Sequence, residues 1–168
     1  TGAGGSIGSE LCRKIVSRNP KTLLLIDNSE FSLYALNEEL KTKIRSLGFN
    51  VILVPILGSV QDYSKMKSVM SDFSVATLFH SAAYKHVPLV ESNIAEGVKN
   101  NVFGTLALAR AAVECDVGVF TLISTDKAVR PTNIMGASKR LAEFVCAYMM
   151  DQGQNTIFSM VRFGNVLG

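Results

Sequence analysis

This sequence of 168 residues has little excess of positive over negative charge, few cysteines and no apolar stretch of great length. Seventeen basic and fourteen acidic residues give a net charge of +3, and they are scattered along the chain. Such a balance argues against a nucleic-acid partner. The longest apolar runs, near residues 51–60 and 75–84, are far shorter than the ~20 residues that span a bilayer, and the opening residues do not resemble a signal peptide.

The three cysteines, Cys12, Cys115 and Cys146, are widely spaced and odd in number, and each lies in a helical pattern. This predicts buried free thiols in a reducing compartment rather than disulfides or metal ligands, and no metal site is expected. Apolar residues make up 48% of the chain, which is ample for the core of one domain.

Glycine gathers at the start, where Gly2, Gly5 and Gly8 form Gly-x-x-Gly-x-x-Gly. A helical pattern follows, so Ser6 and Ile7 fall in its first turn. Glycines allow a tight turn and let backbone N–H groups approach a pyrophosphate at a helix start. These five residues are therefore predicted to bind a dinucleotide cofactor.

An acidic residue follows at a suitable distance, because Asp27 ends a short apolar strand 19 residues after Gly8. A carboxylate at this place suits the adenosine ribose hydroxyls and favours NAD, with NADP left open. The alternative is a Gly-rich loop that binds nothing.

Strand and helix patterns alternate along the whole chain. Strands are expected at residues 22–26, 51–57, 75–79, 117–123 and 156–162, and helices at 33–47, 66–73, 96–113 and 135–150. This alternation predicts an α/β fold with a doubly wound parallel sheet, the NAD(P)-binding Rossmann type, over residues 1–168. Because the Gly-rich pattern normally follows the first strand, we expect a partial domain that lacks this strand.

Several residues at strand ends and in one helix are candidates for binding. The loop with Ser59 and Val60 would lie beside the adenine. The small residues Ala82 and Ala83 would allow close approach of a cofactor, and Lys85 and His86 could meet an anionic substrate. Asn101 is unfavourable inside a helix, which indicates a specific hydrogen bond. Ordinary turns and solvated side chains remain the alternatives for the strand-end positions.

Hydroxyl, acid and amine groups cluster in Ser124-Thr125-Asp126-Lys127, directly after the apolar strand 117–123. Met135 and Lys139 lie four residues apart on one face of the next helix. In open α/β sheets, chemistry occurs at the carboxyl ends of strands. The alternative is a capped turn formed by Thr125, with Lys127 as a surface charge.

The chain resembles the extended short-chain dehydrogenases/reductases, and more narrowly the bacterial UDP-N-acetylglucosamine 4,6-dehydratases of polysaccharide biosynthesis. The resemblance covers essentially the whole chain. It rests on the Gly-rich start and on three motifs: His80-Ser-Ala-Ala-Tyr-Lys-His-Val-Pro-Leu-Val-Glu91, Ser124-Thr-Asp-Lys-Ala-Val-Arg-Pro-Thr-Asn133 and Val161-Arg-Phe-Gly-Asn-Val-Leu-Gly168. Met135 stands where the superfamily has its catalytic tyrosine, so the usual base is absent.

The resemblance implies roles for individual residues. Thr125 would hydrogen-bond O4 of the sugar, Asp126 and Lys127 would act as acid and base, and Lys139 would hold the nicotinamide ribose. Met135 would line the site, while Asn101 would belong to the cofactor site. Arg162 and Asn165 would face the substrate pyrophosphate, with a structural role open for Arg162.

The resemblance implies the NAD-dependent 4,6-dehydration of UDP-N-acetylglucosamine to the 4-keto-6-deoxy sugar. A nucleotide-sugar 4-epimerase and a non-catalytic nucleotide-binding module are the alternatives. The resemblance also implies a homo-oligomer, a C-terminal substrate subdomain that is not in this sequence, and a cytoplasmic catalytic domain. Any anchor in the bacterial inner membrane would be in segments not present here.

Overall fold

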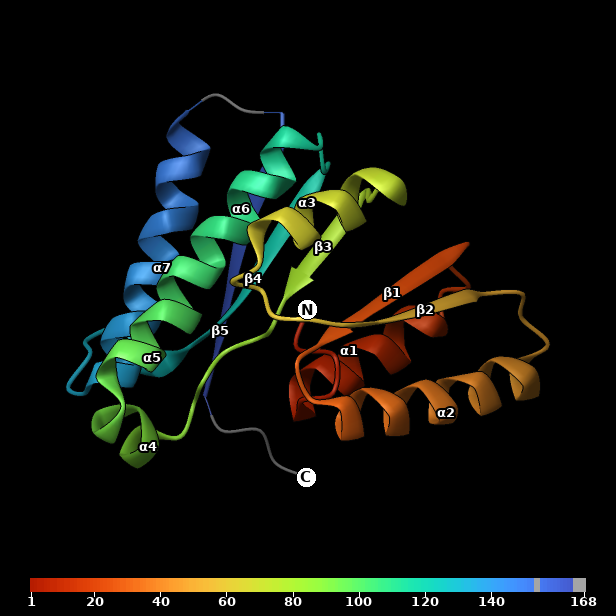
Figure 1. Ribbon diagram of the computed structural model, residues 1–168, viewed down its shortest axis with the longest axis horizontal. Helices are drawn as coiled ribbons and strands as arrows, with labels where there is room; N and C mark the ends of the chain where they lie inside the picture. The colour runs from red at the N-terminus through yellow and green to blue at the C-terminus, as the bar shows by residue number, and fades with distance from the viewer. Residues whose placement is uncertain (153–154, 165–168) are drawn as a thin grey trace. The chain divides into compact units, whose positions relative to one another are not determined.

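The computed structural model describes residues 1–152 and 155–164. The chain forms an α/β fold of two compact units, an N-terminal unit, Thr1–Ser59, and a C-terminal unit, Val60–Gly168 (Figure 1). All the strand pairs are parallel, so the α/β class with parallel strands that the sequence predicts is confirmed.

The N-terminal unit contains α1 (Ser6–Val16), β1 (Thr22–Asp27), α2 (Glu30–Leu47) and β2 (Ile52–Leu57). Strands β1 and β2 pair in parallel, from Thr22 opposite Ile52 to Asp27 opposite Leu57. Both helices lie on one side of these strands, below them in Figure 1. The core between them consists of buried apolar side chains, Ala3, Cys12, Val16, Leu25, Leu33, Leu36, Leu40, Ile44 and Val51.

The ends of α2 follow from its flanking residues. The Ser29 hydroxyl accepts a hydrogen bond from the Ser32 N–H at the first turn. Gly48 ends the helix with a left-handed φ of 66°, a conformation that costs glycine little. The helix stop that the sequence predicts at Gly48 is confirmed.

The C-terminal unit begins with α3 (Tyr63–Asp72), β3 (Thr77–His80), α4 (Val87–Ser92) and α5 (Ile94–Val98). The π-helix η1 (Lys99–Phe103) leads into α6 (Gly104–Glu114). Then follow β4 (Val119–Thr125), the 3-10 turn η2 (Asp126–Ala128), α7 (Ile134–Asp151) and β5 (Ile157–Phe163).

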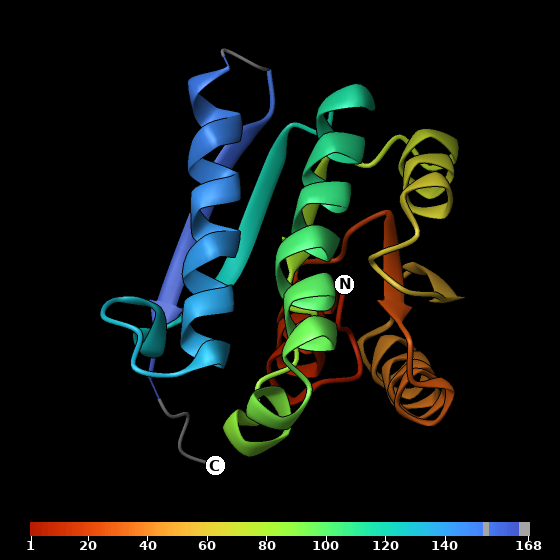
Figure 2. The same cartoon turned by 60° about the vertical axis from the view of Figure 1, so that its left-hand side comes forward.

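Strand β4 lies at the centre of the second sheet, between β3 and β5. Helices α6 and α7 run side by side over one face of this sheet (Figure 2). Phe120 and Leu122 of β4 are fully buried, and the Phe120 ring centroid lies 5.0 Å from that of Phe158. The strand that carries the predicted reactive cluster is therefore anchored on both edges and covered by helices.

The structure differs from the predicted elements in three places. The helix expected at residues 96–113 contains the wider π-helical turn η1, which holds Asn101. The short helix α4 was not predicted; it begins with Val87 and Pro88, and proline suits a first helical turn. Cys115 is half-buried and follows the last residue of α6, whereas Cys12 and Cys146 are buried as predicted.

Within the described residues, no helix combines the length and the apolar character needed to cross a membrane.

Candidate functional site

The Gly-rich loop of the N-terminal unit is held by backbone contacts. Gly2 has a left-handed φ of 68°, and its carbonyl accepts a hydrogen bond from the Gly5 N–H at 3.2 Å. The Ala3 N–H donates to the Ile26 carbonyl at 3.1 Å, which fixes the loop to the end of β1. Helix α1 starts immediately after Gly5, without an acidic residue in its first turn. This helix start suits an anionic group, because its N–H groups and dipole are positive.

Asp27 lies at the end of β1 with both carboxylate oxygens held by backbone donors. Oδ2 accepts the Gly4 N–H at 2.8 Å and Oδ1 accepts the Ser29 N–H at 2.9 Å. A Cβ atom on Gly4 would lie 2.4 Å from the Cβ of Ser32, so only glycine fits there. A carboxylate oxygen has lone pairs for more than one donor, so ribose hydroxyls can still bind. The loop and Asp27 therefore fit a dinucleotide.

In the C-terminal unit, the end of β4 brings together the three reactive groups of the predicted cluster. The Thr125 hydroxyl donates to Asp126 Oδ1 at 3.0 Å, and Lys127 Nζ lies 3.4 Å from the same oxygen. Thr125 Oγ1 also accepts the Lys127 N–H at 3.4 Å, so Thr125 caps the turn η2 as the alternative interpretation expects. The side chains of Asp126 and Lys127 are 57% and 41% exposed, which leaves them accessible to a substrate.

The hydrogen bond from Thr125, together with the charge of Lys127, lowers the pKa of the Asp126 carboxyl. Asp126 is therefore ionised near neutral pH in the free protein. An ionised carboxylate accepts protons, so Asp126 could act as a base and could donate a proton only after one has reached it.

Helix α7 presents Met135 and Lys139 one turn apart, with 4% and 6% exposure respectively. Lys139 Nζ donates to the Ile123 carbonyl of β4 at 2.8 Å, and burial lowers the pKa of Lys139 to about 8. The start of α7 lies against the turn η2, because a Cβ atom on Gly136 would be 2.5 Å from the Lys127 carbonyl oxygen. The structure thus packs the helix that carries Met135 directly against the reactive turn.

Asn101 makes the specific hydrogen bonds that its place in a helix predicts. Its side chain is 1% exposed, and its Oδ1 accepts the Tyr84 N–H at 2.8 Å. Nδ2 donates to the Tyr84 carbonyl at 2.9 Å and to the Ser138 hydroxyl at 3.0 Å. The Asn101 carbonyl accepts the Thr105 hydroxyl at 2.7 Å. Asn101 therefore ties the loop after β3 to α7, so we expect it to serve a cofactor by positioning these elements.

The side chain of Arg162 binds Glu143. Arg162 Nε and Nη2 each lie 2.7 Å from a Glu143 carboxylate oxygen, and Glu143 is 2% exposed. This arrangement favours the structural role that the sequence left open for Arg162 over the predicted contact with a substrate pyrophosphate. Asn165, the other residue predicted for that contact, lies outside the described residues.

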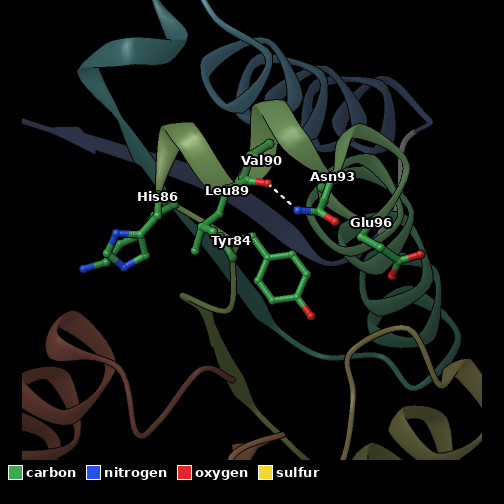
Figure 3. Close-up of a pocket in the computed structure, with 9 residues that line it drawn as sticks. Tyr84, His86, Leu89, Val90, Asn93 and Glu96 are labelled. Atoms are coloured by element: carbon green, nitrogen blue, oxygen red, sulfur yellow. Dashed lines mark hydrogen bonds between the residues drawn. The ribbon is translucent and has the colours of Figure 1, made fainter.

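A cavity of about 380 Å³ lies beside the loop that follows β3. Figure 3 shows the Tyr84 ring beside Leu89, below α4, with Asn93 and Glu96 on the segment that follows. Ala83, Lys85 and His86 also line the cavity, and Lys85 and His86 are exposed. The predicted anion-binding residues therefore border a largely apolar hollow of a size that small ligands occupy.

The remaining predicted positions lie in loops. Ser59 follows β2 in the N-terminal unit, and Val60 opens the C-terminal unit. Val60 is buried, and a Cβ atom on Gly104 would lie 2.9 Å from its Cγ2. Ala82 follows β3 in an irregular segment. Because the Val60 side chain is buried, any contact of Val60 with an adenine would have to come from its backbone atoms.

Sequence reasoning missed Glu143 as part of the site region, and with it the contact that Glu143 makes with Ser124. The Ser124 hydroxyl donates to Glu143 Oε1 at 2.6 Å, and both side chains are buried. The available signal was the spacing of Glu143, one turn beyond Lys139 on the same helix. No group of three or more His, Cys, Asp or Glu side chains that suits a metal ion occurs in residues 1–152 and 155–164.

Comparison with known proteins gives a family and several relatives. The family described as "Polysaccharide biosynthesis protein" matches residues 1–168. The chain is 44% identical over 168 residues to the capsular polysaccharide biosynthesis protein CapD of Staphylococcus aureus, covering 100% of this chain and 28% of CapD. It is 32% identical over 169 residues to a UDP-glucose 4-epimerase of Rickettsia bellii (strain OSU 85-389), covering 99% of this chain and 48% of the epimerase.

A solved structure, that of Pen from Bacillus thuringiensis, matches with a TM-score of 0.88 and 32% identity. The match covers 99% of this chain and 49% of Pen. The chain thus spans between about a quarter and a half of the length of these three proteins.

Proposed function

The chain belongs to the polysaccharide biosynthesis protein family, and from this premise we propose that the whole protein is an NAD-dependent nucleotide-sugar 4,6-dehydratase. The proposed substrate is UDP-N-acetylglucosamine, and the product is the 4-keto-6-deoxy sugar. The observation that carries the proposal is the contact of Asp126 with both Thr125 and Lys127 at the end of β4. Dehydration needs a base that removes the C5 proton and an acid that protonates the C6 hydroxyl. Lys127 and Asp126 would serve as this base and this acid.

The N-terminal unit fits the cofactor of this reaction. The loop of Gly2, Gly5, Ser6, Ile7 and Gly8 would hold the pyrophosphate, and Asp27 the adenosine ribose. NAD, when bound, would supply the hydride acceptor for the oxidation at sugar C4 and the hydride donor for the reduction at C6. Lys139 would hold the nicotinamide ribose; its amine is buried and fixed on the Ile123 carbonyl.

We propose that Asp126 replaces the missing tyrosine. Met135 has no proton to exchange, so the O4 proton passes to Asp126 either directly or through the Thr125 hydroxyl. The lowered pKa of Asp126 supports this step, because the carboxylate is ready to accept. Asp126 then gives the same proton to the C6 hydroxyl, which leaves as water.

Lys127 takes the other proton of the sequence. Once C4 is a ketone, the C5 proton is acidic, and Lys127 is the proposed base that removes it; this role requires Lys127 to give up the charge that it carries in its contact with Asp126. After the hydride has returned to C6, Lys127 gives this proton back to C5. The sum of these steps is the loss of one water from the sugar, without net oxidation.

An isotope experiment on the full-length protein tests this proposal. The protein is incubated with UDP-N-acetylglucosamine in heavy water, and the sugar is followed by mass spectrometry and NMR. We expect the loss of one water and deuterium at C5. A product of unchanged mass would instead identify a 4-epimerase, and bound NAD with an unchanged sugar would leave the non-catalytic module or another sugar nucleotide.

The 4-epimerase is the second candidate, because a UDP-glucose 4-epimerase is among the relatives. Epimerisation also starts with oxidation at C4. It requires no acid and base for C5 and C6, however, so it leaves the Asp126–Lys127 pair without a task. This pair is the reason to prefer the dehydratase.

We also propose that the protein is a homo-oligomer. Leu141, Phe144 and Tyr148 form an apolar stripe on α7, and their exposures are 46%, 53% and 61%. Large exposed side chains in one row on a helix are typical of interfaces. The proposed partner is therefore a second copy of the same protein.

A further inference from the structure

Glu143 of α7 is a buried carboxylate to which the proposed reaction assigns no task. It lies one turn after Lys139 and two turns after Met135. Four hydrogen bonds reach it: from Ser124 Oγ at 2.6 Å, from Arg162 Nε and Nη2 at 2.7 Å each, and from Arg140 Nη1 at 2.9 Å. A buried carboxylate with this many donors is fixed in place and stays charged.

These contacts join α7 to the reactive end of β4. Ser124 lies opposite Arg162 in the parallel pairing of β4 with β5, and Thr125 is the next residue along the strand. Lys139 Nζ binds the carbonyl of Ile123, the residue before Ser124. Helix α7 therefore holds two consecutive residues of β4 directly before Thr125.

Glu143 is also a negative charge that acts on Lys139 and raises the pKa of its amine. Burial raises the pKa of Glu143, but hydrogen bonds from Arg162, Ser124 and Arg140 outweigh it and lower this pKa to about 2. Burial raises the pKa of the nearby Cys146 thiol to about 12, so Cys146 is neutral. His80 of β3 is neutral as well, because burial lowers its pKa well below the usual value.

We propose that Glu143 is a positioning residue for the reaction, acting through two neighbours. Its hydrogen bond with Ser124 fixes the strand end that presents Thr125, and its charge, one turn away on α7, favours the protonated form of the Lys139 amine. This inference rests on the proposed function, because it concerns the same site.

The test compares variants of the full-length protein over a range of pH. Glu143→Gln removes the charge and should lower kcat by about ten- to hundredfold, the usual effect of small displacements at reacting groups. Lys139 is charged below its pKa and loses its proton as the pH rises through it. Without the nearby carboxylate this pKa falls, so the alkaline decline in activity should begin at a lower pH.

Two further variants separate the two effects. Ser124→Ala removes only the contact of Glu143 with the strand. We therefore expect kcat to fall while the alkaline limb, the part of the pH profile where activity declines as the pH rises, stays at the same pH. Glu143→Asp keeps the charge but shortens the side chain, and it should behave like Ser124→Ala. Glu114→Gln is the matched control, since Glu114 is an exposed acid paired with Lys67 on the surface; kcat and pH profile should stay at wild-type values.

A uniform loss of activity in Glu143→Gln, without movement of the alkaline limb, would make Glu143 merely structural and overturn the inference. If Glu143→Gln does not fold, unchanged kcat in Ser124→Ala or a displaced limb in Glu143→Asp would overturn it. A wild type that does not dehydrate the sugar contradicts the proposed function instead. In that case the affinity of the wild type and the same variants for NAD is measured over the pH range. An identical pH dependence of this affinity in all variants would overturn the role of Glu143.

Discussion

The two units present their functional groups by different means. In the N-terminal unit, the loop is held by backbone groups, and Asp27 is fixed by the N–H groups of Gly4 and Ser29. In the C-terminal unit, the end of β4 is held by side chains, including the Lys139 amine and the Glu143 carboxylate. The N-terminal contacts depend on backbone groups that approach closely, and the C-terminal contacts depend on polar side chains.

This difference predicts how substitutions in each unit should affect stability. Where backbone groups form the contacts, any added atom must find space, so even a methyl group can disturb them where a neighbour is close. Where side chains form them, a removed atom leaves a buried partner unsatisfied, which costs about 1–3 kcal/mol. Adding atoms should therefore damage the N-terminal unit, and removing polar groups should damage the C-terminal unit.

The largest expected effect comes from Asp126→Asn, which removes the proton acceptor of the C-terminal unit. The amide cannot take the O4 proton or pass it to the C6 hydroxyl, so turnover should fall by about 10²- to 10⁴-fold. The rate of 4-keto-6-deoxy product formation measures this effect. Asp151→Asn is the control, because Asp151 is an exposed residue at the end of α7. Near-normal turnover in Asp126→Asn would show that another group carries the proton.

A smaller effect is expected from Asn101→Ala, which removes four side-chain hydrogen bonds from the buried junction of η1, Tyr84 and Ser138. The backbone groups of Tyr84 lose their partners, so the free energy of unfolding should fall by about 2 to 4 kcal/mol. Denaturant unfolding of the full-length protein, followed by hydrogen exchange in the loop after β3, measures this change.

Asn93→Ala is the matched control for that variant. Asn93 is exposed and its side chain donates one hydrogen bond, to the Leu89 carbonyl at 2.9 Å. Its loss should cost less than about 1 kcal/mol. Equal losses in both variants would mean that the hydrogen bonds of Asn101 add nothing to the stability of the junction.

The sequence predicted more of the N-terminal unit than of the C-terminal one, for the same physical reason. A turn made of glycines and an acid at the next strand end form a local pattern, because the contacts come from the backbone itself. The helix stop at Gly48 could be predicted in the same way. Apolar periodicity likewise located every strand, since burial on a sheet requires it.

The contacts that Glu143 makes with Ser124 and Arg162 in the C-terminal unit could not be predicted, because they join residues that are distant in the sequence. Glu143 binds Ser124 and Arg162, both 19 residues away along the chain. Nothing local in Arg162 distinguishes a guanidinium that binds a buried carboxylate from one that binds a pyrophosphate. The turn η1 was also missed, because helical periodicity does not reveal one added residue in a turn.

The smallest effect should come from single methyl groups in the Gly-rich loop, and it tests the N-terminal half of the comparison. A Cβ atom on Gly4 would lie 2.4 Å from the Cβ of Ser32 and 3.3 Å from Asp27 Oδ2. Loop and helix must therefore separate, and Gly4→Ala should lower the free energy of unfolding by about 1 to 3 kcal/mol. Thermal unfolding and NAD affinity are the measurements.

Gly5→Ala provides the contrast within the same loop. Gly5 has an extended backbone with φ of −71°, and its Cβ would lie no closer than 3.4 Å to the Gly2 carbonyl oxygen. Alanine adopts this conformation without strain and restricts the unfolded chain, so stability should stay within about 1 kcal/mol of wild type. If Gly4→Ala were equally mild, space beside the backbone would not limit this loop. The contrast between a region sensitive to added atoms and one sensitive to removed atoms would then fail.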